Sequence, residues 1–168
     1  MSIFRADAST GALSALGATG TGAYPFAVAI APNGHFAYVS NLQGNNLSSY
    51  SVNASTGAVT MVGSSVSSVN PFGIAMDPLG RFVWAVNYSV STVSAYTING
   101  STGQLTTAGA PVATGTFPYA VAVPPSGNYV YVANEMGNSV SAYSVNAGTG
   151  QLTLLPGISS SGGHLSRG

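Results

Sequence analysis

Apolar and polar positions alternate in short runs along this chain. Residues 26–31 (FAVAIA) alternate large and small apolar side chains, and a Pro/Gly turn separates them from residues 35–40 (HFAYVS). Residues 47–52 (LSSYSV) and 58–63 (AVTMVG) follow, joined by an STG turn. Short runs of this kind, rich in aromatic and β-branched residues and bounded by turn residues, predict β-strands. We name these four strands A, B, C and D in chain order.

The four-strand pattern repeats along the sequence. The phrase that carries strands A and B occurs three times, at 25–41, 71–87 and 118–134. The phrase that carries the C–D turn occurs four times, at 7–17, 53–63, 99–109 and 146–157. The opening prolines of the three A strands are 46 and 47 residues apart. The chain therefore reads as one C–D hairpin followed by three complete A–B–C–D units.

Strands B and C carry apolar residues on both faces, whereas a strand with one face in water alternates apolar and polar residues. Each small sheet must therefore be covered on both faces. Four short antiparallel strands that repeat every 40–50 residues or so are typical of β-propeller blades. We predict an all-β propeller segment with strand A innermost. Its parts are an outer C–D hairpin (1–23), blade 1 (24–69), blade 2 (70–116), blade 3 (117–158) and a flexible tail (159–168).

The composition excludes several kinds of partner. Only 4% of the residues are charged, Lys is absent and the net charge is zero. Nucleic acids and anionic membrane surfaces are bound by clustered Lys and Arg, so we expect neither as a partner. Cys is absent, which excludes disulfides, Cys-ligated zinc and thiol catalysis. No apolar run approaches the roughly 18 residues of a membrane span, so we expect no membrane insertion.

The ends of the three B strands carry a family resemblance. The stretches YVSN (38–41), WAVN (84–87) and YVAN (131–134) resemble the YVTN signature of lactonase-like β-propellers, and the downstream STGQL phrase is also typical of that group. The resemblance runs from Ser2 to about Pro156 and implies blades of a ring that typically has seven. The family includes sugar-lactone hydrolases, a muconate-lactonising enzyme and surface proteins. Its enzymes place His, Arg and Glu around the central channel, and no such set can be mapped onto this chain.

An arc of about three and a half blades cannot close a ring, because propellers close with about four to eight. The open arc leaves two blade faces rich in Val, Tyr, Phe and Leu, and each large side chain left in water forfeits about 1.5–3 kcal/mol of burial. We therefore expect a homo-oligomer, with a dimer favoured because two copies carry about seven blades' worth of residues. The rival hypothesis is that the residues are a fragment of a longer propeller.

Asn41, Asn87 and Asn134 end the three B strands. One interpretation is a ring of amides near a mouth of the channel that binds a polar ligand. The other is that each side chain bonds to backbone in the turn to strand C, as Asn commonly does.

The B–C loops differ between blades, and variable loops on a regular scaffold are where sites are usually placed. Their distinctive members are Gln43, Tyr88 and Glu135. Glu135 is either a general base or metal ligand, or a solvated loop charge. Together with the three asparagines, these residues are the candidate ligand-binding set.

The remaining polar residues suggest no catalytic set. His35 and Arg81 occupy equivalent positions after the A–B turn, Asp77 reads as a turn residue and His164 lies in a Gly/Ser tail. The sequence contains no phosphate loop, no G-x-S-x-G elbow and no metal-spaced cluster. We predict no catalytic residue, no metal and no cofactor.

These observations favour a non-enzymatic scaffold or binding module, secreted or at a cell surface, with a small-molecule or protein ligand that the sequence does not specify. The alternative is an enzyme similar to sugar-lactone hydrolases, with its site in the central channel. A third hypothesis is an engineered or excised propeller fragment that self-assembles.

Overall fold

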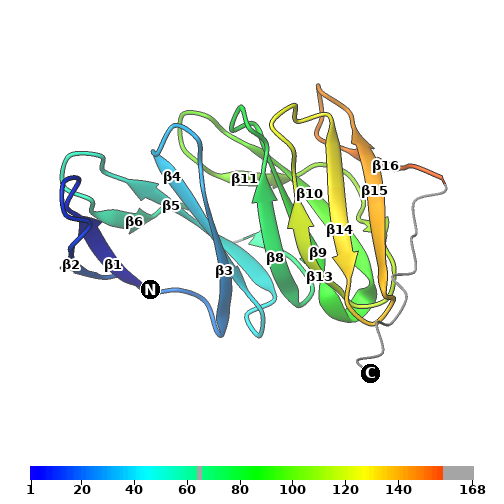
Figure 1. The fold of residues 1–168 in the computed structure, drawn as a ribbon, viewed down its shortest axis with the longest axis horizontal. Helices are drawn as coiled ribbons and strands as arrows, with labels where there is room; N and C mark the ends of the chain where they lie inside the picture. Colours follow the sequence, from blue (N-terminus) through cyan, green and yellow to red (C-terminus); the bar gives the residue numbers. More distant parts are fainter. Residues whose placement is uncertain (64–65, 157–168) are drawn as a thin grey trace.

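The structure is a computed structural model that describes residues 1–63 and 66–156. A two-stranded hairpin, β1 (Ser2–Ala6) and β2 (Leu13–Ala18), stands at one end of a row of three antiparallel sheets (Figure 1). In each of these three sheets the first four strands are neighbours in the order in which they occur in the chain. The predicted fold class, a segment of four-stranded propeller blades, is confirmed.

The strands of the three blades have the following bounds. Blade 1 contains β3 (Pro25–Ile30), β4 (Phe36–Asn41), β5 (Asn46–Val52) and β6 (Val59–Met61), with β7 (Val66–Ser67) paired to β5. Blade 2 contains β8 (Pro71–Met76), β9 (Phe82–Asn87), β10 (Thr92–Ile98) and β11 (Leu105–Thr107), with β12 (Val112–Ala113) paired to β10. Blade 3 contains β13 (Pro118–Ala122), β14 (Tyr129–Asn134), β15 (Ser139–Val145) and β16 (Leu152–Leu154). A 3-10 turn, η1 (Tyr88–Val90), lies between β9 and β10.

The hydrophobic core lies in the seams between the sheets. One cluster joins blades 1 and 2, a second joins blades 2 and 3, and a smaller one joins blade 1 to Met1 beside the hairpin. The A strands of neighbouring blades pack against each other, β3 on β8 and β8 on β13. Gly73 permits this approach, because a Cβ there would lie 2.8 Å from the Tyr119 carbonyl oxygen. The small residues of strand A therefore serve close packing near the axis.

Two equivalent hydrogen bonds join neighbouring blades at the C–D turns. Tyr38 Oη donates to the carbonyl of Gly103 at 2.9 Å, and Trp84 Nε1 donates to the carbonyl of Gly150 at 2.9 Å. Both donor side chains are fully buried, and burial raises the pKa of Tyr38 to about 12. Because a buried donor or acceptor without a partner is costly, these bonds fix the position of each blade on the next.

The C–D turns share one geometry. In each, the side-chain Oδ1 of the first residue accepts hydrogen bonds from the backbone N–H groups two and three residues later. The first residues are Asp7, Asn53, Asn99 and Asn146. Each turn ends at a glycine with positive φ, between 71° and 75°. This geometry explains why the phrase N-x-S/G-T-G recurs, because it builds the turn that receives the neighbouring blade.

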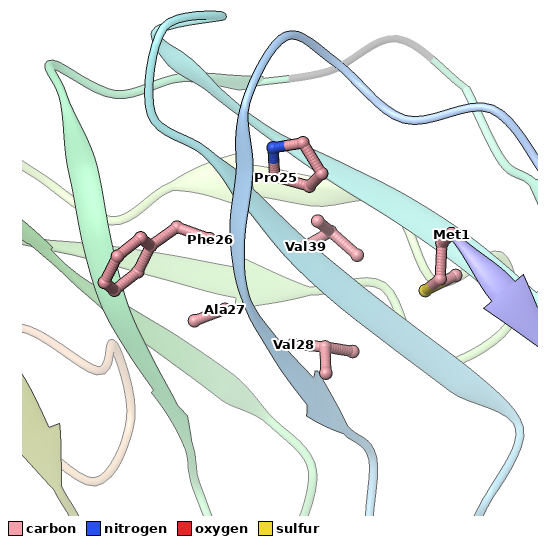
Figure 2. Close-up of a pocket in the computed structure, with 6 residues that line it drawn as sticks. All are labelled: Met1, Pro25, Phe26, Ala27, Val28 and Val39. Atoms are coloured by element: carbon pink, nitrogen blue, oxygen red, sulfur yellow. The ribbon is translucent and has the colours of Figure 1, made fainter.

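The B strands of the three blades differ in how far they are covered. All six residues of β4 and of β9 are buried, whereas β14 alternates exposed and buried residues because no sheet covers its outer face. The hairpin covers only the outer part of blade 1. Figure 2 shows Met1 beside Val28 and Val39, across β3 from Phe26, around a cavity of about 180 Å³.

The predicted tail (159–168) lies outside the described residues. Within residues 1–63 and 66–156, no helix is long and apolar enough to cross a membrane.

Tyr38→Phe tests the seam bond. The substitution keeps the ring but leaves the buried Gly103 carbonyl without its donor, so we expect the free energy of unfolding to fall by about 1–3 kcal/mol in urea denaturation. Tyr24→Phe, which alters an exposed ring, is the control and should change this free energy by less than about 0.5 kcal/mol. Equal stability of the two variants would contradict the role given to the Tyr38 hydroxyl.

Candidate functional site

Five aromatic side chains meet at one end of the A strands, and we call them the rim cluster: Phe26, Phe72, Tyr88, Phe117 and Tyr119. The Phe72 ring centroid lies 4.3 Å from those of Phe26 and Tyr88. It lies 5.2 Å from that of Tyr119, and Phe117 is 4.8 Å from Tyr88. Phe26 and Tyr119 remain 39% and 43% exposed, so the cluster presents aromatic surface to solvent near the axis of the arc.

An irregularity repeated in each A strand places three of these rings. The pairing register with strand B shifts just after the opening proline in all three blades. Such shifts re-aim side chains and are frequent beside functional sites. One rim-cluster aromatic lies in each shift, namely Phe26, Phe72 and Tyr119. The backbone thus turns these rings out of the regular alternation.

The residue before each opening proline is also unusual. Tyr24, Asn70 and Phe117 have φ of 55°, 43° and 53°, a left-handed conformation that non-glycine residues rarely adopt. Their carbonyl groups accept hydrogen bonds from the first backbone N–H of each B–C loop, and in blades 2 and 3 these donors belong to Tyr88 and Glu135. Strained backbone of this kind persists where surrounding bonds hold it, and it clusters at functional sites. Here it attaches the loops to the rim.

Tyr88 and Glu135 meet across the boundary between blades 2 and 3. Tyr88 Oη donates to Glu135 Oε2 at 3.1 Å, while the Phe72 ring stacks on Tyr88 with an interplanar angle of 23°. Desolvation, together with the hydrogen bond to the Glu135 carboxylate and its charge, raises the pKa of Tyr88. The phenol therefore stays protonated at neutral pH and remains a donor. Two of the six candidate residues come together in this way.

The three asparagines lie inside the blades. Asn41 Nδ2 donates to Asn46 Oδ1 at 2.7 Å and to Ser48 Oγ at 2.8 Å. Asn87 and Asn134 donate in the same way to pairs of hydroxyl groups on strand C. All three side chains are buried, and their Nδ2 partners are side chains of strand C and not backbone of the turn. These amides therefore join strand B to strand C within each blade.

The amide oxygens of the asparagines differ between blades. Asn87 Oδ1 accepts a hydrogen bond from Ser68 Oγ at 2.7 Å. The Oδ1 atoms of Asn41 and Asn134 are buried and have no hydrogen-bond partner among the described residues. The positions equivalent to Ser68 in blades 1 and 3 are Gly22 and Gly115. Blades 1 and 3 thus lack the hydroxyl that completes the amide in blade 2.

Gln43 is exposed in the B–C loop of blade 1. It therefore lies at the same end of its blade as the rim cluster, in a loop equivalent to those of Tyr88 and Glu135.

The Arg81–Asp77 pair and His35 lie at the far ends of strands A and B, between the two strands. Arg81 Nε donates to Asp77 Oδ2 at 2.8 Å, and its Nη1 donates to the Ala147 carbonyl of blade 3 at 3.0 Å. Burial of the Asp77 carboxylate opposes ionisation, but the hydrogen bonds from Arg81 outweigh it and keep the pKa of Asp77 below its usual value. His35 is exposed in the A–B turn of blade 1, and His164 lies outside the described residues. No group of three acidic or His side chains forms a metal site in the described part of the chain.

Sequence reasoning missed the aromatic members of strand A. The available signal was an aromatic residue directly after the opening proline in all three repeats, at 26, 72 and 119. The alternation of large and small apolar residues alone assigns these aromatic residues to the packed faces of the blade. A register shift cannot be recognised from the sequence of an apolar strand.

Comparisons with known proteins agree with this architecture. A family model described as lactonase, 7-bladed beta-propeller, matches residues 1–76 and 70–163. A solved structure from Lactobacillus plantarum superimposes with a TM-score of 0.82 at 22% identity, covering 92% of this chain and 47% of the other. A candidate 6-phosphogluconolactonase from Bacteroides fragilis gives 0.79 at 23% identity, covering 91% and 46%. The periplasmic gluconolactonase of Pseudomonas aeruginosa gives 0.73 at 19% identity, covering 88% and 42%. No curated protein matches the chain.

These findings correct the main functional prediction. The interpretation as a non-enzymatic scaffold rested on the lack of a mapped His, Arg and Glu set, and it is wrong. The lactonase family match favours the alternative, a lactonase-type enzyme. The chain spans about half the length of the similar structures, and the likeness to them shows the fold.

Glu135→Gln tests the Tyr88–Glu135 pair. Removing the negative charge of Glu135 makes the phenolate of Tyr88 less unfavourable relative to the neutral phenol. We therefore expect the pKa of Tyr88 to fall toward its ordinary value. Spectrophotometric titration of the phenols measures the shift, and Tyr88→Phe identifies the transition that belongs to Tyr88. Asp7→Asn, which removes a distant carboxylate, should leave the titration unchanged. If Glu135→Gln also leaves it unchanged, the pair does not form.

Proposed function

Because this chain belongs to the lactonase family of seven-bladed β-propellers, we propose that it forms part of a sugar-lactone hydrolase whose site includes the rim cluster and Glu135. The family match over residues 1–76 and 70–163 carries this proposal. The choice of site is supported by the exposed aromatic surface and by a carboxylate held beside it at the inner end of the blades.

Glu135 is the general base of the proposed reaction. The Tyr88 hydroxyl occupies Oε2 of the carboxylate and orients it, and Oε1 accepts a proton from water. The water oxygen forms a bond to the lactone carbonyl carbon, and the bond between that carbon and the ring oxygen breaks. The ring oxygen takes the proton from Glu135 and becomes a hydroxyl group, which returns Glu135 to its carboxylate form and gives a hydroxy acid as the product. The atoms and protons of this hydrolysis balance without a cofactor.

The rim cluster is the proposed binding surface for the sugar ring. Exposed Phe26 and Tyr119 offer apolar faces for the C–H groups of a sugar, and Tyr119 adds a hydroxyl. The substrate class is an uncharged sugar lactone. Arg5 and Arg81, the arginines of the described residues, lie at the other ends of the strands, and the negative charge of Glu135 disfavours a phosphate at the rim.

The test is hydrolysis of glucono-δ-lactone, followed by acid release at constant pH and corrected for the rate in buffer. We expect the wild-type chain to exceed the buffer rate and Glu135→Gln to lower kcat about 100-fold or more, because general-base catalysis contributes at least about that factor. Tyr119→Ala should raise KM about 3- to 10-fold with little change in kcat, because stacking contributes about 0.5–1.5 kcal/mol.

Asp7→Asn is the matched control for loss of a carboxylate. The other three C–D turns have Asn at this position, so the turn is kept, and the rate should equal that of the wild type. A folded wild-type protein that hydrolyses no faster than buffer would overturn the proposed activity. Equal rates for wild type and Glu135→Gln would overturn the assignment of the base.

A further inference from the structure

Blade 3 ends the row of sheets with an uncovered flank. Tyr129 and Tyr131 of β14 are 42% and 38% exposed, and Leu154 of β16 is 50% exposed. Ala133 lies on the same open face as these tyrosines. We call these four residues the C-terminal flank. It lies at the opposite end of the row from the hairpin (Figure 1).

The seams within the chain show what such a flank contacts. Tyr129 and Tyr131 occupy the positions of Phe36 and Tyr38 in blade 1. There, Phe36 lies against Gly103 of the next C–D turn, and Tyr38 Oη donates to the carbonyl of the same glycine.

Blade 2 repeats this arrangement on blade 3. Phe82 lies against Gly150, and Trp84 donates to its carbonyl. The B strands of blades 1 and 2 thus each meet a turn glycine of the next unit with one ring and one hydrogen-bond donor. In blade 3 the equivalent ring is Tyr129 and the equivalent donor is Tyr131, and both lie at the open face.

The hairpin at the other end carries the matching turn. Of the four C–D turn glycines, Gly103 and Gly150 face aromatic rings and Gly57 faces Leu16 of the hairpin. A Cβ at Gly11 would meet no described atom within 4 Å. Gly11 has a φ of 71°, like the other turn glycines, and its N–H donates to the Asp7 carbonyl as theirs do to the first residue of the turn. Among residues 1–63 and 66–156, one C–D turn is therefore unfilled, and one ring and one donor are unused.

We propose that a second copy of this chain covers the C-terminal flank. The Tyr129 ring of one copy lies against Gly11 of the other, and Tyr131 Oη donates to the Gly11 carbonyl, as Tyr38 does to Gly103. The contact continues the blade-to-blade seam already present twice within the chain. It is independent of the proposed hydrolase activity, because it uses none of the rim cluster or Glu135.

The contact is head-to-tail, and two such contacts close a pair of copies into a ring. The similar structures are about twice as long as this chain, so two copies supply the blade material of one ring. The hairpin also presents apolar surface, since Phe4 and Leu13 are 54% and 67% exposed. An open head-to-tail contact builds filaments, whereas a closed pair leaves neither the C-terminal flank nor the Gly11 turn free.

The inner part of blade 1, beside the hairpin, is also open. Val28 and Ile30 of β3 are more than half exposed, and the cavity in Figure 2 lies between β3 and Met1.

Light scattering after gel filtration tests the proposal on the full chain. We expect twice the chain mass of 16.7 kDa for the wild type. Tyr131→Ser and Gly11→Asn should each give the single-chain mass. Asn tolerates the left-handed backbone at Gly11 and has space there in one copy, but not beneath a partner's Tyr129 ring. Gly100→Ala, in a turn position where other repeats have Ala, is the control and should remain paired.

A mixture of the two variants tests the head-to-tail geometry. A Tyr131→Ser copy keeps Gly11 and a Gly11→Asn copy keeps Tyr131, so one of the two contacts in a mixed pair is intact. We expect mixed pairs, detected with differently labelled copies, although neither variant pairs with itself. Wild type at the single-chain mass up to about 100 µM, or no mixed pairs, would overturn the proposal and assign the flank to a different polypeptide segment.

Discussion

Each sheet in this protein must have both faces covered, and the rest of the structure depends on that constraint. The strands are short and the sheets small, so little apolar surface is buried within a blade and most of the core lies between blades. A seam combines this burial with one buried hydrogen bond from a strand B aromatic to a turn carbonyl. The packing supplies the stabilising free energy, and the hydrogen bond sets the register, because a displaced blade leaves a buried donor without a partner.

The same constraint explains how much could be predicted from sequence. Apolar residues on both faces of strands B and C, together with a constant spacing, were enough to predict blades and their strand order. The C–D hairpin at the start of the chain was also recognisable, because its turn repeats the N-x-S/G-T-G chemistry with Asp7 in place of Asn. The contact of Leu16 with Gly57 was not predictable. Leu16 belongs to strand D of the hairpin, whereas in the complete blades an aromatic ring of strand B lies against the turn glycine.

The candidate site was less accessible to sequence reasoning. Tyr88 and Glu135 were identified because their loops differ from the equivalent loops, but their contact depends on the relative position of two blades. The aromatic residues after the opening prolines were hidden within an apolar pattern, and only a register shift turns them toward the axis. The asparagines behave differently. Their position repeats in every blade, and each side chain joins strand B to strand C within its own blade. Repetition of a polar position therefore indicates a structural role here, whereas the repeated aromatic position at 26, 72 and 119 contributes to the candidate site.

The two joints between complete blades use the same pair of partners, an aromatic residue on the second strand and a glycine in the next outer turn. A joint that does not change from unit to unit allows a gene to gain or lose a whole repeat in one recombination event without inventing new contacts. The period of 46 or 47 residues is thus also the step by which this architecture can lengthen, shorten or exchange parts during evolution.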